Sequence, residues 1–414
     1  MADPKRPPLM PLDEALASLL AKATPVLGSE SVSTFDADGR VLAQDVVSAL
    51  TVPPRDNSSM DGYAVRTADC AAPGAVLTVA QRIPAGSVGG PLAAGTAARI
   101  FTGAQIPEGA DAVVMQEDTT ALPEEGSLGR VQLDLVPAVG QWIRRAGEDV
   151  AAGDVVLARG ERLTPAALGL AASVGFDRLQ VAKRPRVALL STGDELVMPG
   201  EVAPEAMKPG AIYNSNRFFM RALLHRLGCE VDDLGIVPDN REATIEALRG
   251  AAEASDLIIT TGGVSVGEED HIKAAVQALG ELQLWSLSMK PGKPFAYGRI
   301  GGTHVTGLPG NPVSSFLTFL LLVRPFLLTL QGATRVAPQP IAVRADFDWP
   351  RADRRREFLR ARRNAAGGLA LFGNQSSGVL TSTVWGDGVI DTPAGQGFKA
   401  GDLVQFISFA SLLA

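Results

Sequence analysis

The feature that most constrains the fold of this chain is a regular alternation of apolar, strand-like runs and amphipathic helical segments between residues 183 and 331. Runs such as RPRVALLSTG, CEVDDLGIV and DLIITTGG alternate with helical segments such as SNRFFMRALLHRL, REATIEALRGAAEA and HIKAAVQALG. Because strands that are joined through helices run parallel in one sheet, this order predicts a doubly wound, mainly parallel α/β sheet with helices on both faces.

The flanking sequence has a different pattern, with short alternating strands separated by glycine and proline turns. The chain has 44 glycines and 28 prolines among 414 residues and only 5 % aromatic side chains, which is typical of frequent turns and small aliphatic cores. We therefore predict a multidomain α/β plus β protein. Its expected parts are an elongated N-terminal and linker element (1–52 with 145–182) that contains a helix over 12–23, a β-rich domain (53–144), the α/β domain (183–331) and a C-terminal β-barrel-like domain (332–414).

The charge and cysteine content exclude several classes of function. The chain has 38 basic and 45 acidic residues, a net charge of −7, so nucleic acid or an anionic membrane would need a local basic patch. Seven arginines lie between residues 351 and 363, and we interpret them as the solvated edge of a β-hairpin rather than a nucleic-acid site. Cys70 and Cys229 lie far apart without a CxxC motif, so neither a disulfide framework nor a structural zinc site is expected.

The most apolar stretch, residues 313–330, is interrupted by Arg324 and Pro325. It therefore falls short of the roughly 20 uninterrupted apolar residues of a membrane span. The first residues contain no apolar segment of the kind found in secretory signals. We expect a buried helix here, and a soluble cytoplasmic protein without a membrane partner.

Two of the predicted parallel strands end in glycine-containing turns, at the sheet edge where open α/β folds bind ligands. LLSTGDEL places Glu195 after one strand, and IITTGGVSVGEEDH places Gly262, Gly263 and Ser265 after another. Glycine lets backbone N–H groups approach an anion closely. One such turn is equally consistent with a plain strand-to-helix connection, but two on one sheet favour a phosphate-containing ligand. Neither turn matches the Walker A or GxGxxG pattern.

Two further segments are predicted to border the same site. In MKPGKPFAYG a stiff Pro-Gly turn holds Lys290 near Lys293, and their mutual repulsion is costly unless an anion lies between them; the alternative is two solvated surface lysines. In GLPGNPVSS, Asn311 and Pro312 are typical of a helix N-cap and first helical residue. This loop, which includes Pro309, either shapes the pocket or only caps the helix.

Carboxylates recur at the predicted turns, and together with a phosphate ligand they suggest Mg²⁺. Asp239 has a second interpretation, since Asp239 and Glu242 have the spacing of a capping box. The three histidines have no ligand spacing, so a histidine metal site is not expected. The turn carboxylates are Asp61, Asp149, Asp194, Glu195, Asp239 and Asp270.

Taken together, these motifs occur in an order and spacing that resembles one known family. NSSMDGYAVR, IFTGAQIPEGADAVV, RRAGEDV, LLSTGDEL, YNSNR, TTGGVSVGEEDH, MKPGKPFAYG and GLPGNPVSS extend over nearly the whole chain, which thereby resembles the molybdopterin molybdenumtransferases, the family of MoeA and the gephyrin E domain. The resemblance implies insertion of molybdenum from molybdate into adenylylated molybdopterin, with release of AMP and with Mg²⁺ as cofactor. It also implies a homodimer whose pocket combines both subunits, an adenylyltransferase that supplies the substrate, and apo-molybdoenzymes that accept the product.

The resemblance further implies roles for single residues. The stretch NQSSG around Ser377 matches the glutamine-glycine-serine stretch of the family only approximately, and His271 stands where a tyrosine is expected. Implied as catalytic are Asp61, Asp149, Glu195, Lys290 and Lys293, as metal ligands Asp61, Glu195 and Asp270, and as substrate-binding Thr102, Gly262, Gly263, Ser265, Asp239, Pro309, Pro312, Arg360 and Ser377.

Two other functions share part of this sequence pattern. A molybdopterin adenylyltransferase has the same type of α/β domain, but it is a small free-standing domain without the β modules or the MDGYA motif. A gephyrin-like scaffold would use the dimer surface to bind a peptide, but the chain has no appended adenylyltransferase domain or long linker.

Overall fold

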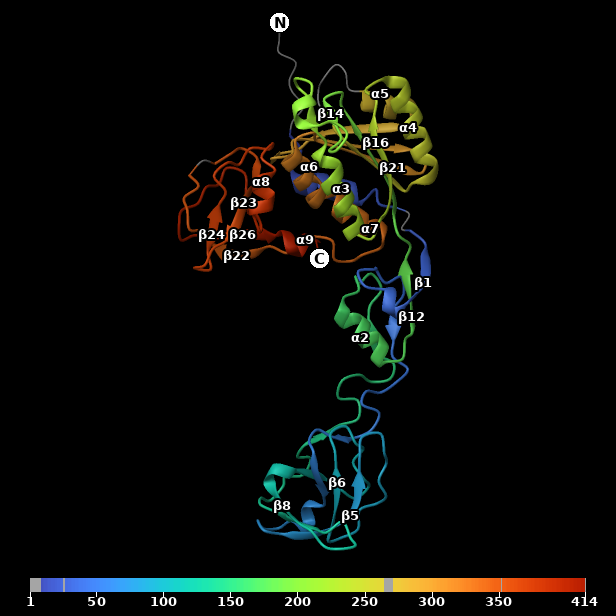
Figure 1. Ribbon diagram of the computed structural model, residues 1–414, viewed down its shortest axis with the longest axis vertical. Helices are drawn as coiled ribbons and strands as arrows, with labels where there is room; N and C mark the ends of the chain where they lie inside the picture. Colours follow the sequence, from blue (N-terminus) through green and yellow to red (C-terminus); the bar gives the residue numbers. More distant parts are fainter. Residues whose placement is uncertain (1–8, 25–26, 264–270, 351, 414) are drawn as a thin grey trace. The chain divides into compact units, whose positions relative to one another are not determined.

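The computed structural model describes residues 9–24, 27–263, 271–350 and 352–413 (Figure 1). The chain divides into two compact units. One unit comprises residues 45–158 and 165–178, and the other comprises the N-terminal residues to 44, residues 159–164 and residues 179–414. The sheets and helices described below confirm the predicted multidomain α/β plus β class. The predicted four-part division stays a prediction.

The larger unit is built on a six-stranded sheet in the order β16-β13-β17-β21-β20-β18. The first four strands pair in parallel, and β20 and β18 complete the sheet as an antiparallel edge. The predicted mainly parallel sheet is therefore confirmed. The strands are β13 (Arg186–Thr192), β16 (Glu230–Val237), β17 (Leu257–Thr261), β18 (Glu281–Ser286), β20 (Pro294–Ile300) and β21 (Thr303–Leu308).

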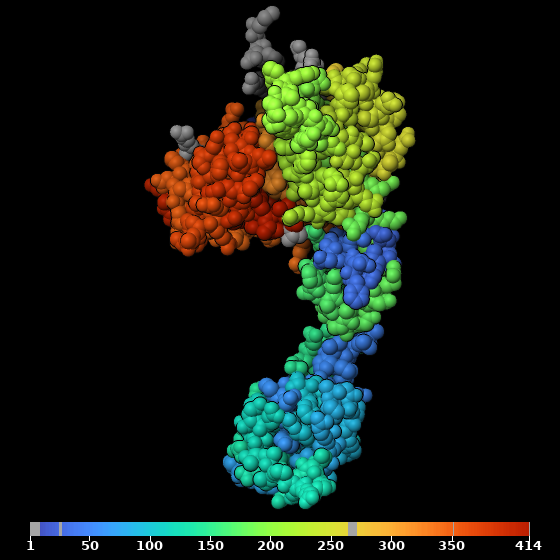
Figure 2. All heavy atoms as spheres, viewed as in Figure 1, coloured from blue at the N-terminus to red at the C-terminus, as the bar shows by residue number. Residues whose placement is uncertain are grey.

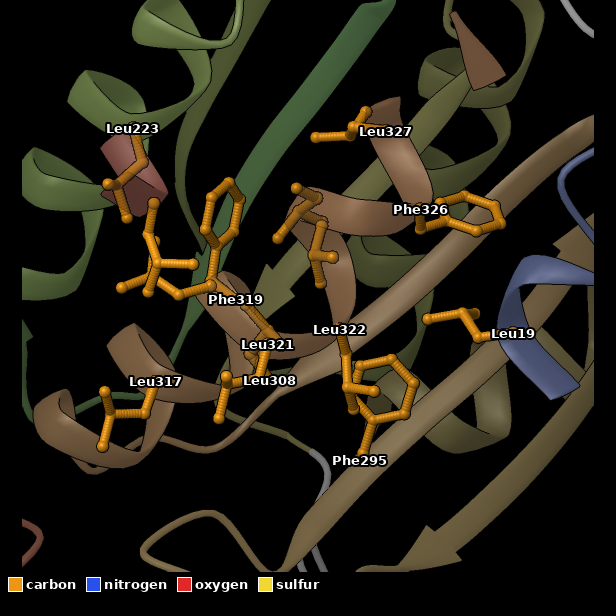
Figure 3. Close-up of a cluster of buried hydrophobic side chains, with 14 of the residues drawn as sticks. Leu19, Leu223, Phe295, Leu308, Leu317, Phe319, Leu321, Leu322, Phe326 and Leu327 are labelled. Carbon is orange, nitrogen blue, oxygen red and sulfur yellow. The ribbon is translucent and has the colours of Figure 1, made fainter. Parts of the chain in front are cut away.

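Successive side chains of the central strands point to opposite faces of this sheet, and each face has its own core. Val187 and Leu189 of β13 belong to one core, and Ala188 and Leu190 belong to the other. Figure 3 shows part of the first core. Helices on both faces, as predicted, cover these cores: α1 (Leu12–Leu20), α3 (Ser215–Arg226), α6 (Pro312–Thr318) and α7 (Arg324–Leu330) on the first, α4 (Arg241–Ala254) and α5 (His271–Leu279) on the second.

The apolar stretch forms one long helix, in which α6 continues through the π-helical segment η5 (Phe319–Val323) into α7. By length and composition alone Pro312–Leu330 is able to cross a membrane, but 89 % of its most apolar window is buried. Figure 3 shows Leu317, Phe319 and Phe326 among the packed side chains of the core. Arg324 is buried with its Nε donating to the Leu412 carbonyl at 2.6 Å. The expected buried helix is thus confirmed.

A second sheet in the larger unit has the order β19-β23-β25-β26-β22, with β24 paired to β23. Its first strand, β19, comes from the α/β segment: the predicted strand LQLWSLSM ends at Ser286, and Met289 then pairs with Arg356 and Lys290 with Glu357. The chain therefore joins the α/β part to this C-terminal module by backbone pairing. The elements are β19 (Met289–Lys290), β22 (Ile341–Arg344), β23 (Arg356–Arg363), β24 (Leu369–Leu371), β25 (Gly388–Thr392), β26 (Leu403–Ser408), α8 (Thr381–Trp385) and α9 (Phe409–Leu413).

The smaller unit holds a third six-stranded sheet in the order β7-β4-β6-β5-β9-β8. Between residues 53 and 145 the described chain contains only the 3₁₀ turns η2 (Thr67–Asp69) and η3 (Gln116–Asp118) besides strands, which confirms the predicted β-rich character. The strands are β4 (Gly62–Val65), β5 (Val76–Ile83), β6 (Thr96–Ile100), β7 (Ala112–Met115), β8 (Thr119–Leu122) and β9 (Arg130–Leu133).

The remaining elements are short. Helix α2 (Pro165–Ser173) was not predicted, because its alanines and leucines do not lie on one side of the helix and only Ala171 is buried. Helix α1 ends at Leu20, before the predicted residue 23. The other pieces are β1 (Ser29–Ser33), η1 (Thr34–Asp36), β2 (Val46–Val47), β3 (Asn57–Ser58), β10 (Ile143–Arg144), β11 (Val155–Leu157), β12 (Arg178–Ala182), β14 (Leu196–Val197), η4 (Pro204–Ala206) and β15 (Ile212–Tyr213).

Candidate functional site

A cleft of about 560 Å³ opens at the carboxyl edge of the central sheet, where the sequence predicted a ligand site. Thr192 and Thr261 end the neighbouring strands β13 and β17 and line the cleft. Gly310, Asn311 and Pro312, which follow β21, also line it. The loops after three adjacent parallel strands therefore meet at one place.

The turn after β17 needs its two glycines. Gly262 and Gly263 have φ angles of +91° and +65°, and a Cβ on Gly263 would lie 2.7 Å from Cγ1 of Ile272. The Gly262 N–H donates to the Leu308 carbonyl at 3.1 Å. Gly262 thus lines the cleft, but its N–H is already hydrogen-bonded within the protein. This N–H therefore cannot contribute to the predicted anion-binding nest. Ser265 lies outside the described residues.

The clearest donor groups in the cleft lie at the beginning of helix α3. Asn214 is the N-cap, and its Oδ1 accepts from the Arg217 N–H at 3.2 Å. Its side chain is only 2 % exposed, and its Nδ2 has no hydrogen-bond partner within the described chain. Ser215 and Asn216 begin the helix beside it and line the same cleft. A helix begins with backbone N–H groups that lack intrahelical partners, so this place is suited to an anion.

The sequence predicts a helix over this segment, but no role in the site was predicted for Asn214. A signal was present, because an asparagine directly before a strongly helical run is a typical N-cap. The sequence does not show that the second side-chain atom of Asn214 is left unpaired in a cleft. The backbone N–H of Asn214 donates to the Val197 carbonyl at 3.0 Å, which holds the cap residue against the end of β14.

Glu195 lies in the turn after β13 and lines the cleft, as the sequence predicted. Its carbonyl accepts from the Ile212 N–H at 2.7 Å, which fixes this turn against β15. Among the described residues it is the one charged side chain in the cleft lining. No group of three or more histidine, cysteine, aspartate or glutamate side chains able to hold a metal ion is found in the part of the chain that the structure describes. Asp270 lies outside that part, and Asp61 belongs to the other compact unit.

The charge of Lys290 is already paired with two carboxylates of the protein, which differs from the prediction that an external anion lies between Lys290 and Lys293. The Lys290 Nζ lies 2.9 Å from Glu357 Oε1 and 3.1 Å from Asp353 Oδ2. Burial tends to lower the pKa of Lys290, but hydrogen bonds to these two carboxylates outweigh it, and the pKa is raised. The premise that Lys290 needs an external anion to be neutralised is therefore wrong, because the C-terminal module supplies two carboxylates. Lys293 is exposed and has no ion pair among the described residues.

Arg360 is 1 % exposed and is held inside the C-terminal module. Its guanidinium donates to Ser382 Oγ at 3.1 Å and to the carbonyls of Phe358 and Ser376 at 3.1 and 3.2 Å. Burial lowers its pKa to about 10. In this conformation its donors organise the loop that carries Ser377 and do not reach into the cleft.

The loop of Ser377 contacts the beginning of α6. The Val313 N–H donates to the Ser377 carbonyl at 2.9 Å, and Gly378 lines the cleft. Asn311 occupies the N-cap position and Pro312 the first helical position, as predicted, although the Asn311 side chain forms no cap hydrogen bond. Pro309 is buried directly after β21. This loop therefore both begins the helix and forms part of the cleft wall.

The capping-box interpretation of Asp239 is wrong. The N-cap of α4 is Asn240, whose Oδ1 accepts from the Ala243 N–H at 2.9 Å. Asp239 is half-buried one residue before the cap, in the turn after β16. Its predicted role in substrate binding stays a prediction.

In the smaller unit the structure brings Asp61 and Thr102 together. Asp61 Oδ1 accepts from both the Thr102 N–H and the Thr102 hydroxyl, each at 2.8 Å. These bonds, the backbone one foremost, lower the pKa of the exposed Asp61 carboxyl. Asp149 is also exposed, in a turn where its N–H donates to the Val52 carbonyl. Both acidic side chains are thus accessible within this unit.

Half of the six described arginines between residues 351 and 363 are tied into the fold, Arg360 by the hydrogen bonds given above. Arg355 pairs with Asp353, and Arg356 pairs with Asp391 at 2.6 Å and with Asp13 at 2.8 Å. The charges of Arg355 and Arg356 are thus compensated locally, Arg360 is buried rather than solvated, and Arg354, Arg362 and Arg363 are exposed as the prediction of a solvated hairpin edge expects.

Comparison with known proteins places this architecture in a family. Three family models match in succession: the MoeA N-terminal region (domain I and II) over residues 10–175, a probable molybdopterin binding domain over 188–329, and the MoeA C-terminal region (domain IV) over 342–409. A molybdopterin molybdenumtransferase of Haemophilus influenzae is 44 % identical over 328 residues, which cover 78 % of each chain. Molybdopterin molybdenumtransferase 2 of Mycobacterium tuberculosis is 38 % identical over 379 residues, which cover 88 % of this chain and 90 % of the relative.

A solved structure agrees over the same length. The molybdopterin biosynthesis moeA protein from Pyrococcus horikoshii OT3 is similar with a TM-score of 0.82 and 30 % identity, and the match covers 97 % of this chain and all of that one. Sequence relatives and structural neighbours thus point to one assignment, and the relatives are named as transferases. This chain belongs to the molybdopterin molybdenumtransferase family, enzymes of molybdenum cofactor biosynthesis.

Proposed function

We propose that the cleft at the carboxyl edge of the central sheet binds adenylylated molybdopterin, and that the protein transfers molybdenum from molybdate to it with release of AMP. In this reaction water cleaves the phosphoanhydride bond and leaves AMP and the pterin phosphate. The two dithiolene thiols replace two oxo groups of molybdate, which leave as water with the two thiol protons and two further protons, so molybdenum stays at oxidation state +6. The observation that carries the proposal is that Asn214, which lines the cleft at the first turn of α3, has a buried Nδ2 without a hydrogen-bond partner among the described residues.

A phosphate oxygen is the partner that this place lacks. A buried N–H group without a partner costs free energy, and this free energy is regained when a substrate oxygen comes within hydrogen-bond distance of it. The first N–H groups of α3 and its dipole add further attraction for an anion. No lysine or arginine is among the described residues that line the cleft, so neutral donors provide its affinity for phosphate there.

Mg²⁺ is the cofactor that we propose for the same place. Magnesium in phosphate sites is commonly held by one or two carboxylates together with the substrate's own phosphate oxygens. The exposed Glu195 in the cleft fits that donor chemistry, and Asp61 and Asp270 are the further ligands that the family resemblance implies. Bound there, the ion would neutralise charge on the diphosphate.

The rest of the site is proposed from the resemblance. Asp61 and Thr102, with Asp149, would act from the smaller unit, and a homodimer would let one subunit complete the pocket of the other. Lys293, which is exposed, is better placed than Lys290 to meet molybdate. We further propose that the enzyme works in the cytoplasm, between an adenylyltransferase that supplies its substrate and apo-molybdoenzymes that accept the cofactor.

The test is a complete reaction with purified protein, adenylylated molybdopterin, Mg²⁺ and molybdate. Release of AMP is followed by chromatography, and cofactor formation by reconstitution of an apo-molybdoenzyme. We expect both, and both should depend on molybdate. Consumption of ATP with bare molybdopterin would instead indicate an adenylyltransferase, and binding of substrate without AMP release would indicate a scaffold.

Asn214→Ser tests the observation itself. Serine is also a good N-cap, so α3 should stay capped while the amide donor is lost. A hydrogen bond to a charged group contributes about 1.5–3 kcal/mol, so we expect the substrate KM to rise about tenfold to a hundredfold. Asn240→Ser, at the cap of α4 and outside the cleft lining, is the matched control and should leave KM unchanged. Equal KM values for Asn214→Ser and the wild type would remove the basis of the proposal.

A further inference from the structure

An apolar hollow of about 460 Å³ lies beside the polar cleft, and nothing in the reaction described so far uses it. Its walls come from three helices. Helix α3 contributes Phe218 and Phe219, α6 contributes Phe316, and α8 contributes Val384, with Leu380 directly before it. Phe218 is 54 % exposed and Val384 is 85 % exposed. Apolar side chains left this open in a concave place are typical of a binding site.

The hollow adjoins the cleft. Tyr213 and Ser215 line both, so the beginning of α3 forms the border between them. The Tyr213 hydroxyl donates to the Val202 carbonyl at 2.7 Å, which fixes the ring at this border. In Figure 2 the light-green atoms around α3 lie against the red and orange atoms of the C-terminal module that carries α8. A ligand bound in the cleft therefore has an apolar surface directly beside its polar end.

We propose that the hollow binds the adenine ring of the adenylylated substrate, with the adjoining phosphate at the beginning of α3. The inference rests on the proposed function, and it adds the place where the nucleotide base is recognised. Adenine presents two flat faces that stack on aromatic side chains, and Phe218, Phe316 and Tyr213 provide such surfaces.

The pterin is a poorer occupant of this hollow. A pterin ring carries an amino group, a carbonyl and ring N–H groups that need partners when they are buried. The hollow offers few polar groups: the hydroxyls of Tyr213 and Thr383 already donate to the carbonyls of Val202 and Leu380, and Ser215 lies at the rim toward the cleft. Adenine has fewer groups to satisfy, and its amino edge can stay at the open side of the hollow.

The experiment measures the dissociation constants of AMP and of ribose 5-phosphate for the full-length protein by isothermal titration calorimetry. The variants are Phe218→Ala and Val384→Glu. Since both side chains are exposed, neither change removes a core contact. Leu403→Glu, at a residue that is 72 % exposed on β26 and outside the hollow, is the matched control for adding a charge at an exposed apolar position.

Removing an aromatic side chain on which a base stacks commonly weakens the affinity for that base about tenfold to a hundredfold. We expect AMP to bind that much more weakly to Phe218→Ala. Val384→Glu should weaken AMP binding at least about tenfold, because the base would have to bury the new carboxylate against the apolar wall. Ribose 5-phosphate, which keeps the sugar and the phosphate but lacks the base, should bind the variants and the wild type equally. Leu403→Glu should bind both ligands as the wild type does.

Several results would overturn the inference. They are absence of AMP binding to the wild type, AMP affinity in both variants within twofold of the wild type, and equal weakening of AMP and ribose 5-phosphate. Loss of self-association in the two variants with AMP binding intact would assign the hollow to a second copy of the chain. Failure of the proposed function is recognised separately, because the wild type would then release no AMP from adenylylated molybdopterin.

Discussion

Replacing Lys290 by alanine is expected to loosen the junction between β19 and β23 as well as to affect activity. The Lys290 ammonium pairs with Glu357 at 2.9 Å and Asp353 at 3.1 Å. Asp353 would keep two hydrogen bonds from the Arg355 guanidinium. The Glu357 side chain, which is only 3 % exposed, would keep the Trp349 indole N–H but lose its cation.

The magnitude follows from this partial burial. Removing one partner of a fully buried pair costs about 3–5 kcal/mol, and removing one partner of an exposed pair costs at most about 1 kcal/mol. The Lys290 side chain is 41 % exposed while Glu357 is buried, so we place the loss between these limits. An expected loss of about 2 kcal/mol in local opening free energy corresponds to about 30-fold faster amide exchange.

Hydrogen–deuterium exchange measured by mass spectrometry on peptides that cover β19 and β23 is the assay. Lys290→Ala should accelerate exchange there, and Glu357→Gln in the same molecule should restore much of the protection, because no buried charge is then left unpaired. Lys293→Ala, at an exposed lysine with no ion pair in the described chain, is the control and should lower cofactor formation without changing exchange. Unchanged exchange in Lys290→Ala, or equal acceleration in Lys293→Ala, would refute the reasoning.

Three further predictions follow from single contacts. Burial lowers the pKa of His304 from 6.5 to about 4, so the unfolded state takes up a proton first and stability should fall by about 3 kcal/mol as the pH drops from 6.5 to 4; urea unfolding should show this fall, and His304→Gln should remove it. Gly263→Ala should destabilise the turn after β17 by about 1–3 kcal/mol, because φ is +65° and the new Cβ meets Ile272; thermal unfolding measures it, and an unchanged midpoint would contradict the assigned strain. Thr102→Val should raise the pKa of Asp61, since one of two donors is lost; carboxyl NMR titration should detect this rise, and an unchanged pKa would assign the whole shift to the backbone N–H.

The sequence predicted what depends on local pattern. The alternation of strands and helices, the start of α6 at Pro312 and the ends of β13 and β17 at the ligand edge all follow from the spacing of apolar residues and from turn residues. The environment of Lys290 could not be predicted in this way, because its two carboxylates lie more than 60 residues further along the chain. The sequence shows that Lys290 and Lys293 are close, but not that one of them is already neutralised.

The environments of Arg360 and Asn214 also could not be predicted from the sequence. An arginine in a run of arginines is expected at the surface, yet Arg360 is buried because three neutral oxygens from its own module accept its donors. An asparagine before a helix is expected to do no more than cap, yet Asn214 caps with its Oδ1 while its buried Nδ2 has no hydrogen-bond partner among the described residues. In both cases the decisive fact is which tertiary partner reaches the side chain, and periodicity carries no information about that.

The beginning of α3 explains why one ligand should need both neighbouring spaces. Asn214, Ser215 and Asn216 lie before and in the first turn and face the polar cleft, while Phe218 follows Ser215 by three residues and so lies on the same side of the helix, one turn further on. One turn of helix advances 5.4 Å, so polar donors and an aromatic surface follow each other over a short distance. Free phosphate can contact only the polar donors, and a free base can contact only the aromatic surface. A nucleoside monophosphate joins phosphate and base through a single sugar, so under the proposed arrangement AMP should bind more tightly than either fragment.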